Sequence, residues 1–194
     1  MSYHIYQTRG FIIRGANTGE ADRTIFIFTE HLGLLLVNAR AARKVSSKLR
    51  YSLQNYSFAR VALVRGKNVW RLTDAEEIFS FSPIQGGAKL KLIAGAFSLV
   101  ARFVHGEGEN KTLFESLHDL FDFLQREELS CEETLLLETL AACRILSALG
   151  YVGESKTLAP FLCAPTSKFL LSDFAPHRPE ALQEINRALR ESQL

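Results

Sequence analysis

The amino-acid sequence predicts an α+β fold, in which an N-terminal five-stranded OB-fold-like β-barrel is followed by a C-terminal α-helical bundle. In the first part of the chain the apolar stretches are short, β-branched or aromatic, and separated by turn residues, which is typical of strands. In the second part, apolar residues recur at helical spacing. The net charge changes sign between the two parts. We therefore expect two domains, residues 1–80 and residues 81–194.

Five stretches of the first domain have the composition of β-strands. Glycine and asparagine residues separate the first three, and Arg65-Gly66-Lys67-Asn68 is typical of a tight hairpin turn. Five short strands favour a small barrel, of which the OB-fold is the commonest design. An SH3-like barrel fits the number of strands nearly as well. The predicted strands are Thr8–Arg14, Thr24–Thr29, Gly33–Ala39, Phe58–Arg65 and Val69–Thr73.

Four helices are expected in the second domain. Ser130 and Glu133 have the spacing of a capping box at the start of the third helix, and Pro179 is suited to open the fourth. The segment Tyr151–His177 lacks a helical period, so we expect an irregular connection there. The apolar stripes that mark the helices are Leu90–Val104, Leu113–Leu124, Leu136–Cys143 and Leu182–Leu189.

The charge distribution is asymmetric. Residues 1–75 carry twelve Lys or Arg and four Asp or Glu, a net charge of +8, whereas the rest of the chain carries eleven and seventeen, a net charge of −6. A basic half joined to an acidic half indicates that the first half faces a polyanion. The alternative is that basic side chains keep a β-domain soluble and protect its edges. Charge alone does not separate these two interpretations.

A basic segment, residues 39–55, lies between the third and fourth predicted strands. It contains five basic residues and no acidic ones, and it is too long for a simple hairpin loop. Long loops in compact domains are usually functional or mobile, so these cations are candidates for contact with successive phosphates. The alternative is a solvated, flexible excursion. The basic residues of this segment, which we call the basic connection, are Arg40, Arg43, Lys44, Lys48 and Arg50.

Aromatic residues provide a second candidate signal for nucleic-acid binding, because exposed aromatics on an OB-fold can stack on bases. Tyr51, Tyr56, Phe58 and Trp70 lie in or near the last two strands, among basic residues. The alternative is that they fill the core, as we expect for Phe58. Strand alternation places Trp70 and Leu72 on one face and Arg71 outward.

The sequence contains no recognised catalytic motif. Phosphate-binding loops, dinucleotide-binding glycine motifs, HExxH and GxSxG are all absent. Glu20 and Asp22 are the only close acidic pair in the first 75 positions, and with Arg23 beside them we expect a local turn network. We therefore predict no catalytic residues and no cofactor.

Metal binding, membrane insertion and disulfides are also not predicted. Cys131, Cys143 and Cys163 have no ligand spacing, and core packing accounts better for Cys143. The sequence has no run of eighteen apolar residues and no signal-peptide pattern at its start. The expected location is the cytoplasm.

Four short motifs follow one another along the first domain. They are Gly19-Glu20-Ala21-Asp22-Arg23, Phe28-Thr29-Glu30-His31-Leu32-Gly33, Ala39-Arg40-Ala41-Ala42-Arg43-Lys44 and Leu72-Thr73-Asp74-Ala75-Glu76. In this order they resemble the RecO family of DNA repair and recombination mediators. The resemblance covers roughly residues 8–80; each motif is weak alone, but their succession is fairly specific. This chain departs from the family at Asn55, where proline is frequent, and it lacks the four-cysteine zinc module of some members; it is also shorter than many relatives.

The resemblance implies a mediator without catalytic chemistry. RecO-like proteins bind single- and double-stranded DNA, anneal complementary strands, and work with RecR to load RecA onto strands coated by single-stranded-DNA-binding protein. Their location is the bacterial cytoplasm, with nucleoid association during repair. The motif match places DNA contact on Arg40, Arg43 and Lys44. Charge placement adds Lys48 and Arg50, and after them Arg65, Lys67 and Arg71.

The resemblance also implies that the helical domain captures the acidic, hydrophobic C-terminal tail of single-stranded-DNA-binding protein. A groove between amphipathic helices flanked by basic residues suits such a tail. The available candidates are Lys89, Lys91, Arg102 and Arg144, but ordinary helix-surface charge is the better explanation for any single one of them.

Two other classes of function remain open from the sequence. One is an OB-fold RNA-binding protein, which would prefer folded RNA to single-stranded DNA. The other is a protein-interaction adaptor whose barrel binds an acidic partner and which binds DNA only weakly.

Overall fold

The computed structural model describes residues 4–45, 47, 49–67, 69–81, 87–153 and 155–192. The chain forms two compact units, which are interleaved in sequence. The first, here called the barrel unit, comprises Met1–Leu90 and Val104–Lys111; the second, the helical unit, comprises Lys91–Phe103 and Thr112–Leu194. The division into domains at residue 80 stays a prediction.

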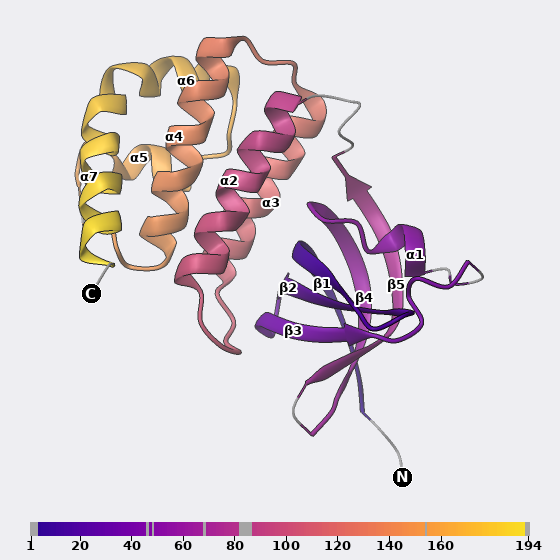
Figure 1. Cartoon of the computed structure of the whole chain (residues 1–194). Coiled ribbons are helices and arrows are strands. Elements are labelled where there is room, and N and C mark those ends of the chain that lie inside the picture. Colours follow the sequence, from indigo (N-terminus) through magenta and orange to yellow (C-terminus); the bar gives the residue numbers. More distant parts are fainter. Residues whose placement is uncertain are drawn as a thin grey trace. The chain divides into compact units, whose positions relative to one another are not determined.

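The barrel unit contains the five expected strands, which form a closed barrel in the order β1-β2-β3-β5-β4 (Figure 1). Strand β1 pairs antiparallel with both β2 and β4, and the barrel closes where β3 and β5 run parallel. This arrangement is that of an OB-fold, so the predicted fold class is confirmed. The strands are β1 (Ile5–Thr18), β2 (Asp22–Thr29), β3 (Gly33–Ala39), β4 (Ser57–Arg65) and β5 (Trp70–Ser80).

Strands β1 and β5 extend furthest beyond their predicted bounds, and pairing explains both extensions. Strand β1 continues through Gly15 to Thr18, because this part pairs with the start of β2 across the hairpin. Strand β5 continues through a charged stretch to Ser80, which pairs with Ser57 at the start of β4. In both cases backbone hydrogen bonds to a neighbouring strand maintain the extended conformation despite weak strand propensity.

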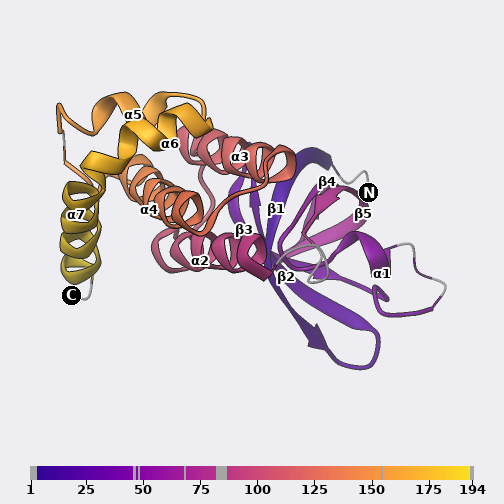
Figure 2. The same cartoon turned by 90° about the horizontal axis from the view of Figure 1, so that it is seen from above.

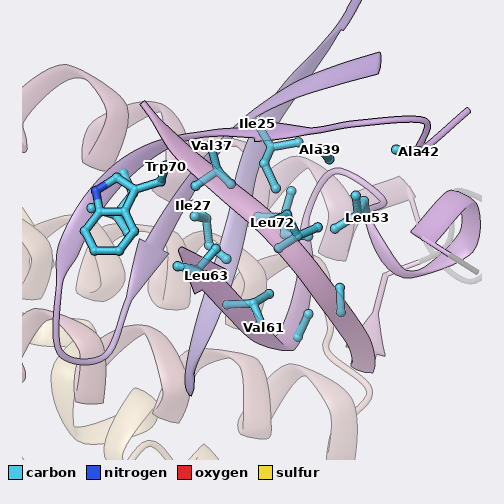
Figure 3. Close-up of a cluster of buried hydrophobic side chains, with 14 residues drawn as sticks. Ile25, Ile27, Val37, Ala39, Ala42, Leu53, Val61, Leu63, Trp70 and Leu72 are labelled. Carbon is cyan, nitrogen blue, oxygen red and sulfur yellow. The ribbon is translucent and has the colours of Figure 1, made fainter. Parts of the chain in front are cut away.

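Fourteen buried side chains fill the barrel interior, and strand alternation selects them. Trp70 lies at one end of this row of side chains, and Ala42 and Leu53 lie at the other (Figure 3). Leu72 is also buried and Arg71 is exposed, as predicted. Phe58 is buried as predicted, but it lies on the outer face of β4 and stacks on Phe11 with ring centroids 4.6 Å apart.

The four predicted helices are present as α2 (Gly87–Phe103), α3 (Lys111–Arg126), α4 (Cys131–Ala148) and α7 (Arg178–Glu191). The capping box of α4 is confirmed: the Glu133 backbone N–H donates to Ser130 Oγ at 3.1 Å, and the Ser130 N–H donates to Glu133 Oε2 at 2.7 Å. Helix α7 packs against α4 (Figure 1). Its buried residues are Ala181, Ile185 and Ala188. Of the expected stripe, Ile185 is therefore buried, whereas Leu182 and Leu189 are partly exposed.

The prediction of an irregular connection over Tyr151–His177 is wrong. The segment contains α5 (Ala159–Cys163), α6 (Lys168–Phe174) and the 3-10 turn η1 (Ala175–His177). These helices are too short to show a hydrophobic period, and tertiary contacts stabilise them because Phe161, Leu171 and Phe174 are buried.

Arg144 of α4 secures this segment. Only 6% of the residue is exposed, and its guanidinium donates to Asp119 Oδ2 and Thr166 Oγ1 at 2.8 Å each and to the Phe161 carbonyl at 2.9 Å. Burial lowers the pKa of the guanidinium, and the Asp119 carboxylate opposes that shift. Arg144 is therefore a buried structural residue and not an ordinary surface charge.

The three cysteines are free thiols, and two of them are exposed. Cys143 is fully buried, as predicted, and burial raises the pKa of its thiol to about 11, which makes it a poor nucleophile. Within the described ranges, no cluster of three or more His, Cys, Asp or Glu residues could hold a metal ion. Across the same ranges, every helix is too short or too polar to cross a membrane.

Candidate nucleic-acid interface

The basic connection is attached to the barrel at several points. It leaves β3 at Ala39 and includes the short helix α1 (Leu49–Ser52), and the buried side chains of Ala42 and Leu53 belong to the interior cluster (Figure 3). Arg40, Arg43 and Lys44 are exposed between these attachments. The connection thus presents cations to solvent from a segment whose apolar residues close one end of the barrel, so the described part is not a free excursion.

The turn of the β1–β2 hairpin holds the first half of the connection in place. The Asp22 carboxylate accepts a hydrogen bond of 2.8 Å from the Ala41 backbone N–H, at a residue with a positive φ of 53°. The Arg43 N–H donates to the Ala21 carbonyl at 2.9 Å. Figure 2 shows this hairpin projecting from the barrel on the side where α1 lies. The contacts of Asp22 are therefore long-range, and the predicted local turn network is wrong for this residue.

Arg43 has a structural role as well as a charge. Its Nη1 lies 3.2 Å from the Gly19 carbonyl oxygen and 3.3 Å from that of Glu20. These contacts orient the guanidinium against the hairpin turn and leave the charge exposed. Arg40 and Lys44 have no such contact among the described residues, so they are the cleaner probes of phosphate binding.

Arg23 joins the hairpin to the far end of the connection. Its Nη2 donates a short hydrogen bond of 2.6 Å to Asn55 Oδ1, just before β4 begins. The next residue, Tyr56, has a positive φ of 65° and donates its backbone N–H to the Ile12 carbonyl at 2.9 Å. The replacement of a frequent proline by Asn55 therefore does not leave the start of β4 unsupported, because the asparagine amide provides a long-range contact.

Two candidates of the connection fall outside this description. Lys48 lies outside the described residues, and nothing can be said of the Arg50 side chain. The Tyr51 side chain, a candidate for base stacking, is likewise outside the description. Their DNA contact stays a prediction.

Arg65, Lys67 and Arg71 do not join this group. Arg65 is the last residue of β4, Lys67 lies in the turn between β4 and β5, and Arg71 follows Trp70 at the start of β5. Trp70 lies at the end of the barrel interior opposite to Ala42 and Leu53 (Figure 3). Arg65 Nη2 lies 3.3 Å from Glu107 Oε2, so this charge is partly neutralised, whereas Lys67 and Arg71 are exposed. The candidate residues whose side chains the structure describes thus form two separate sets, one on the basic connection and one at the opposite end of the barrel interior.

Trp70 is a core residue. Only 4% of it is exposed, and its indole N–H donates to Glu107 Oε1 at 2.9 Å. Residues 104–111, which contain Glu107, belong to the barrel unit although they lie between two helices in sequence. Base stacking by Trp70 is therefore excluded. The sequence could not indicate this, because the partner of the indole N–H, Glu107, lies 37 positions further along the chain.

The sequence of the barrel is similar to that of a known protein family. Residues 1–81 match the family model described as "Recombination protein O N terminal". The predicted resemblance to the RecO family is confirmed. The match covers every strand of the RecO-like barrel together with the basic connection.

Curated relatives support the same resemblance to RecO. The chain is 35% identical over 115 residues to "DNA repair protein RecO" of Dehalococcoides mccartyi, covering 59% of this chain and 46% of that protein. It is 26% identical over 148 residues to the protein of the same description from Clostridium novyi, covering 76% and 57%. The corresponding values for Heliobacterium modesticaldum are 28% over 165 residues, covering 77% and 53%. The chain spans about half the length of these relatives.

Proposed function

We propose that this protein acts in DNA repair as a non-catalytic, DNA-binding recombination mediator of the RecO kind. The resemblance of the barrel to RecO N-terminal domains and the relatives described as DNA repair proteins support this role. In finer terms, the protein binds single- and double-stranded DNA, anneals complementary strands, and assists RecA loading on strands coated by single-stranded-DNA-binding protein. It acts in the cytoplasm, at the nucleoid during repair.

The observation that carries the proposal is the exposed set of cations on an anchored segment. Arg40, Arg43 and Lys44 project from the basic connection, and residues 39–55 contain no acidic side chain. A polyanion approaching this segment meets three exposed cations, and the neighbouring Asp22 carboxylate is engaged by the Ala41 backbone N–H. Lys48 and Arg50 extend the same run in sequence.

Contacts of this kind favour annealing over sequence recognition. Phosphate contacts position a nucleic acid but carry no base information, so the bases stay free to pair with a second strand. Binding should consequently be insensitive to sequence and should weaken steeply as salt is raised, because each phosphate contact releases counterions. Arg65, Lys67 and Arg71, at the other end of the barrel, are candidates for a second, weaker contact.

The helical unit and the barrel are proposed to bind protein partners. We propose a RecR-like protein and the C-terminal tail of single-stranded-DNA-binding protein as these partners. Lys89, Lys91 and Arg102 remain candidates for contact with the acidic tail, and the burial of Arg144 removes it from that set.

The test compares two double variants that remove the same charge from different places. Arg40→Ala with Lys44→Ala removes two exposed cations of the basic connection; Lys156→Ala with Arg190→Ala removes two exposed cations of the helical unit. Fluorescence anisotropy with an unstructured single-stranded DNA, measured across a salt series, gives the affinity and its salt dependence. Thermal unfolding confirms that both variants fold like the native chain.

We expect weaker binding only for the variant of the connection. The slope of log K against log salt should become shallower by about 1.4 for that variant, because each phosphate contact on single-stranded DNA contributes about 0.7. The helical-unit variant should match the native chain. Equal losses in both variants would assign the effect to net charge alone, and absence of native binding at low salt would overturn the proposed function.

A further inference from the structure

Arg23 is a half-buried cation with very few partners. Within the described part of the chain its one hydrogen bond is to the neutral side chain of Asn55, and no carboxylate forms an ion pair with it. Its Nε is buried without any partner. Burial lowers the pKa of the guanidinium, which shows that the surroundings do not compensate the charge. A buried donor without a partner costs free energy of folding, so the retention of this charge requires a reason.

The neighbouring strand is shaped to accommodate this side chain. A Cβ atom at Gly15 of β1 would lie 2.6 Å from Arg23 Nε and 3.0 Å from Nη2, closer than real Cβ contacts allow. The absence of a side chain at Gly15 therefore lets the guanidinium lie against the β1 backbone. Asn55 then holds one edge of the guanidinium through Nη2.

The guanidinium of Arg23 borders two hollows of the barrel unit. One, of about 270 Å³, is lined by Arg23, Arg43 and Gln54 together with three apolar residues of the connection, Ala42, Leu49 and Leu53. The other, of about 450 Å³, continues past Arg23 and Gln54 to Asn55 and Tyr56. None of the residues that line either hollow is acidic. The smaller hollow thus has two guanidinium groups in its wall and no carboxylate.

We propose that the hollow between Arg23 and Arg43 binds a phosphate group of a nucleic-acid backbone. A guanidinium presents N–H donors in a fixed planar arrangement that matches phosphate oxygens, and a partly desolvated site strengthens such hydrogen bonds. Arg43 is already oriented by the carbonyls of Gly19 and Glu20. The hollow, of about 270 Å³, has room for a phosphate group between the two arginines.

This inference rests on the proposed DNA binding and adds the place at which one phosphate of the bound strand is held. The exposed cations Arg40 and Lys44 attract the strand from solvent. Arg23 and Arg43 fix one phosphate at the junction of the hairpin turn and the connection. The strand then follows the barrel from a defined point.

The experiment replaces Arg23 in two ways. Arg23→Gln removes the charge at similar length, and Arg23→Lys keeps the charge but loses the planar set of donors. Affinity for unstructured single-stranded DNA is measured by anisotropy across a salt series. Competition by inorganic phosphate is measured in parallel, because the same chemistry would capture a free anion. Thermal unfolding of each variant separates binding from folding.

The expected result is specific to a phosphate contact. Arg23→Gln should weaken DNA binding and make the salt slope shallower by about 0.7, the contribution of one phosphate on a single strand. Arg23→Lys should weaken binding with the salt slope retained. Both variants lose the hydrogen bond to Asn55, so a small fall in the unfolding temperature is compatible with the site, and the change in salt slope is the deciding readout.

Three outcomes would overturn the inference. Unchanged DNA binding in Arg23→Gln, alongside a loss in the Arg40 and Lys44 variant, would refute this site and leave the proposed function standing. A lower unfolding temperature with an unchanged salt slope would make Arg23 a structural residue. Competition by millimolar inorganic phosphate that Arg23→Gln abolishes, without any change in DNA affinity, would assign the hollow to a free anion.

Discussion

Asp22 and Arg23 show what single residues contribute to this fold. Both look like parts of a local turn in the sequence, yet Asp22 binds the Ala41 backbone 19 positions away and Arg23 binds Asn55 32 positions away. Sequence spacing cannot reveal such partners, because the pairing of β1 with β2 and the path of the connection decide them. Periodicity did locate Leu72 correctly as buried and Arg71 correctly as exposed, because alternation along a strand is local.

Two glycines with positive φ allow a matched test at this scale. Gly33 has a φ of 72°, and a Cβ there would collide with the backbone of Gly108. Gly19 has a φ of 59°, and a Cβ there would meet nothing. Gly19→Ala should therefore lower the free energy of unfolding by about 1–2 kcal/mol, the cost of holding alanine in the left-handed backbone conformation. Gly33→Ala should cost a further 1–3 kcal/mol or so, because the chain must move to relieve the collision.

Urea unfolding of the two variants checks this expectation. The difference between them isolates the close approach of residues 104–111 to the start of β3. Equal losses of stability in the two variants would contradict that approach.

At the scale of helices and strands, the length of each element decided whether its hydrophobic pattern could be recognised in the sequence. The strands and the four long helices were found because each repeats its hydrophobic pattern over several turns or alternations. Helices α5 and α6 were missed because five and seven residues are too few to show a period. Their stability comes from tertiary contacts, namely the burial of Phe161, Leu171 and Phe174 and the hydrogen bond from Arg144 to the Phe161 carbonyl. The basic connection was located correctly, but its anchoring by Ala42 and Leu53 depends on a barrel end that only the closed sheet creates.

The capping box of α4 gives a prediction for one element. Ser130→Ala removes the acceptor for the Glu133 N–H and should lower the free energy of unfolding by about 1 kcal/mol. Ser130→Asn, which keeps an acceptor oxygen at the N-cap, should remain close to the native stability. Chemical denaturation monitored by far-UV circular dichroism measures both variants, and identical losses would show that the cap contributes nothing.

For the molecule as a whole, the sign of the charge predicts where DNA binds. The first 75 residues carry a net charge of +8 and the remainder −6, and the exposed cations of the connection lie on the positive side. Hydrogen–deuterium exchange of the full chain with single-stranded DNA should show protection in peptides from residues 39–55. Peptides of α3, α4 and α7 should exchange at their unliganded rates.

The Arg40→Ala, Lys44→Ala variant is the control for this experiment and should lose the protection. Protection of the helical peptides in the native chain would instead place a DNA contact on the acidic half. That result would contradict the charge argument at the level of the whole molecule.

The interleaving of the two units has a practical consequence for dissecting the protein. A fragment that stops at residue 90 carries all five strands but omits residues 104–111. It would expose the indole N–H of Trp70, which Glu107 satisfies in the full chain, and it would remove the backbone against which Gly33 lies. A barrel prepared by truncation would therefore be an incomplete domain, and weak DNA binding by such a fragment would be no measure of the intact protein.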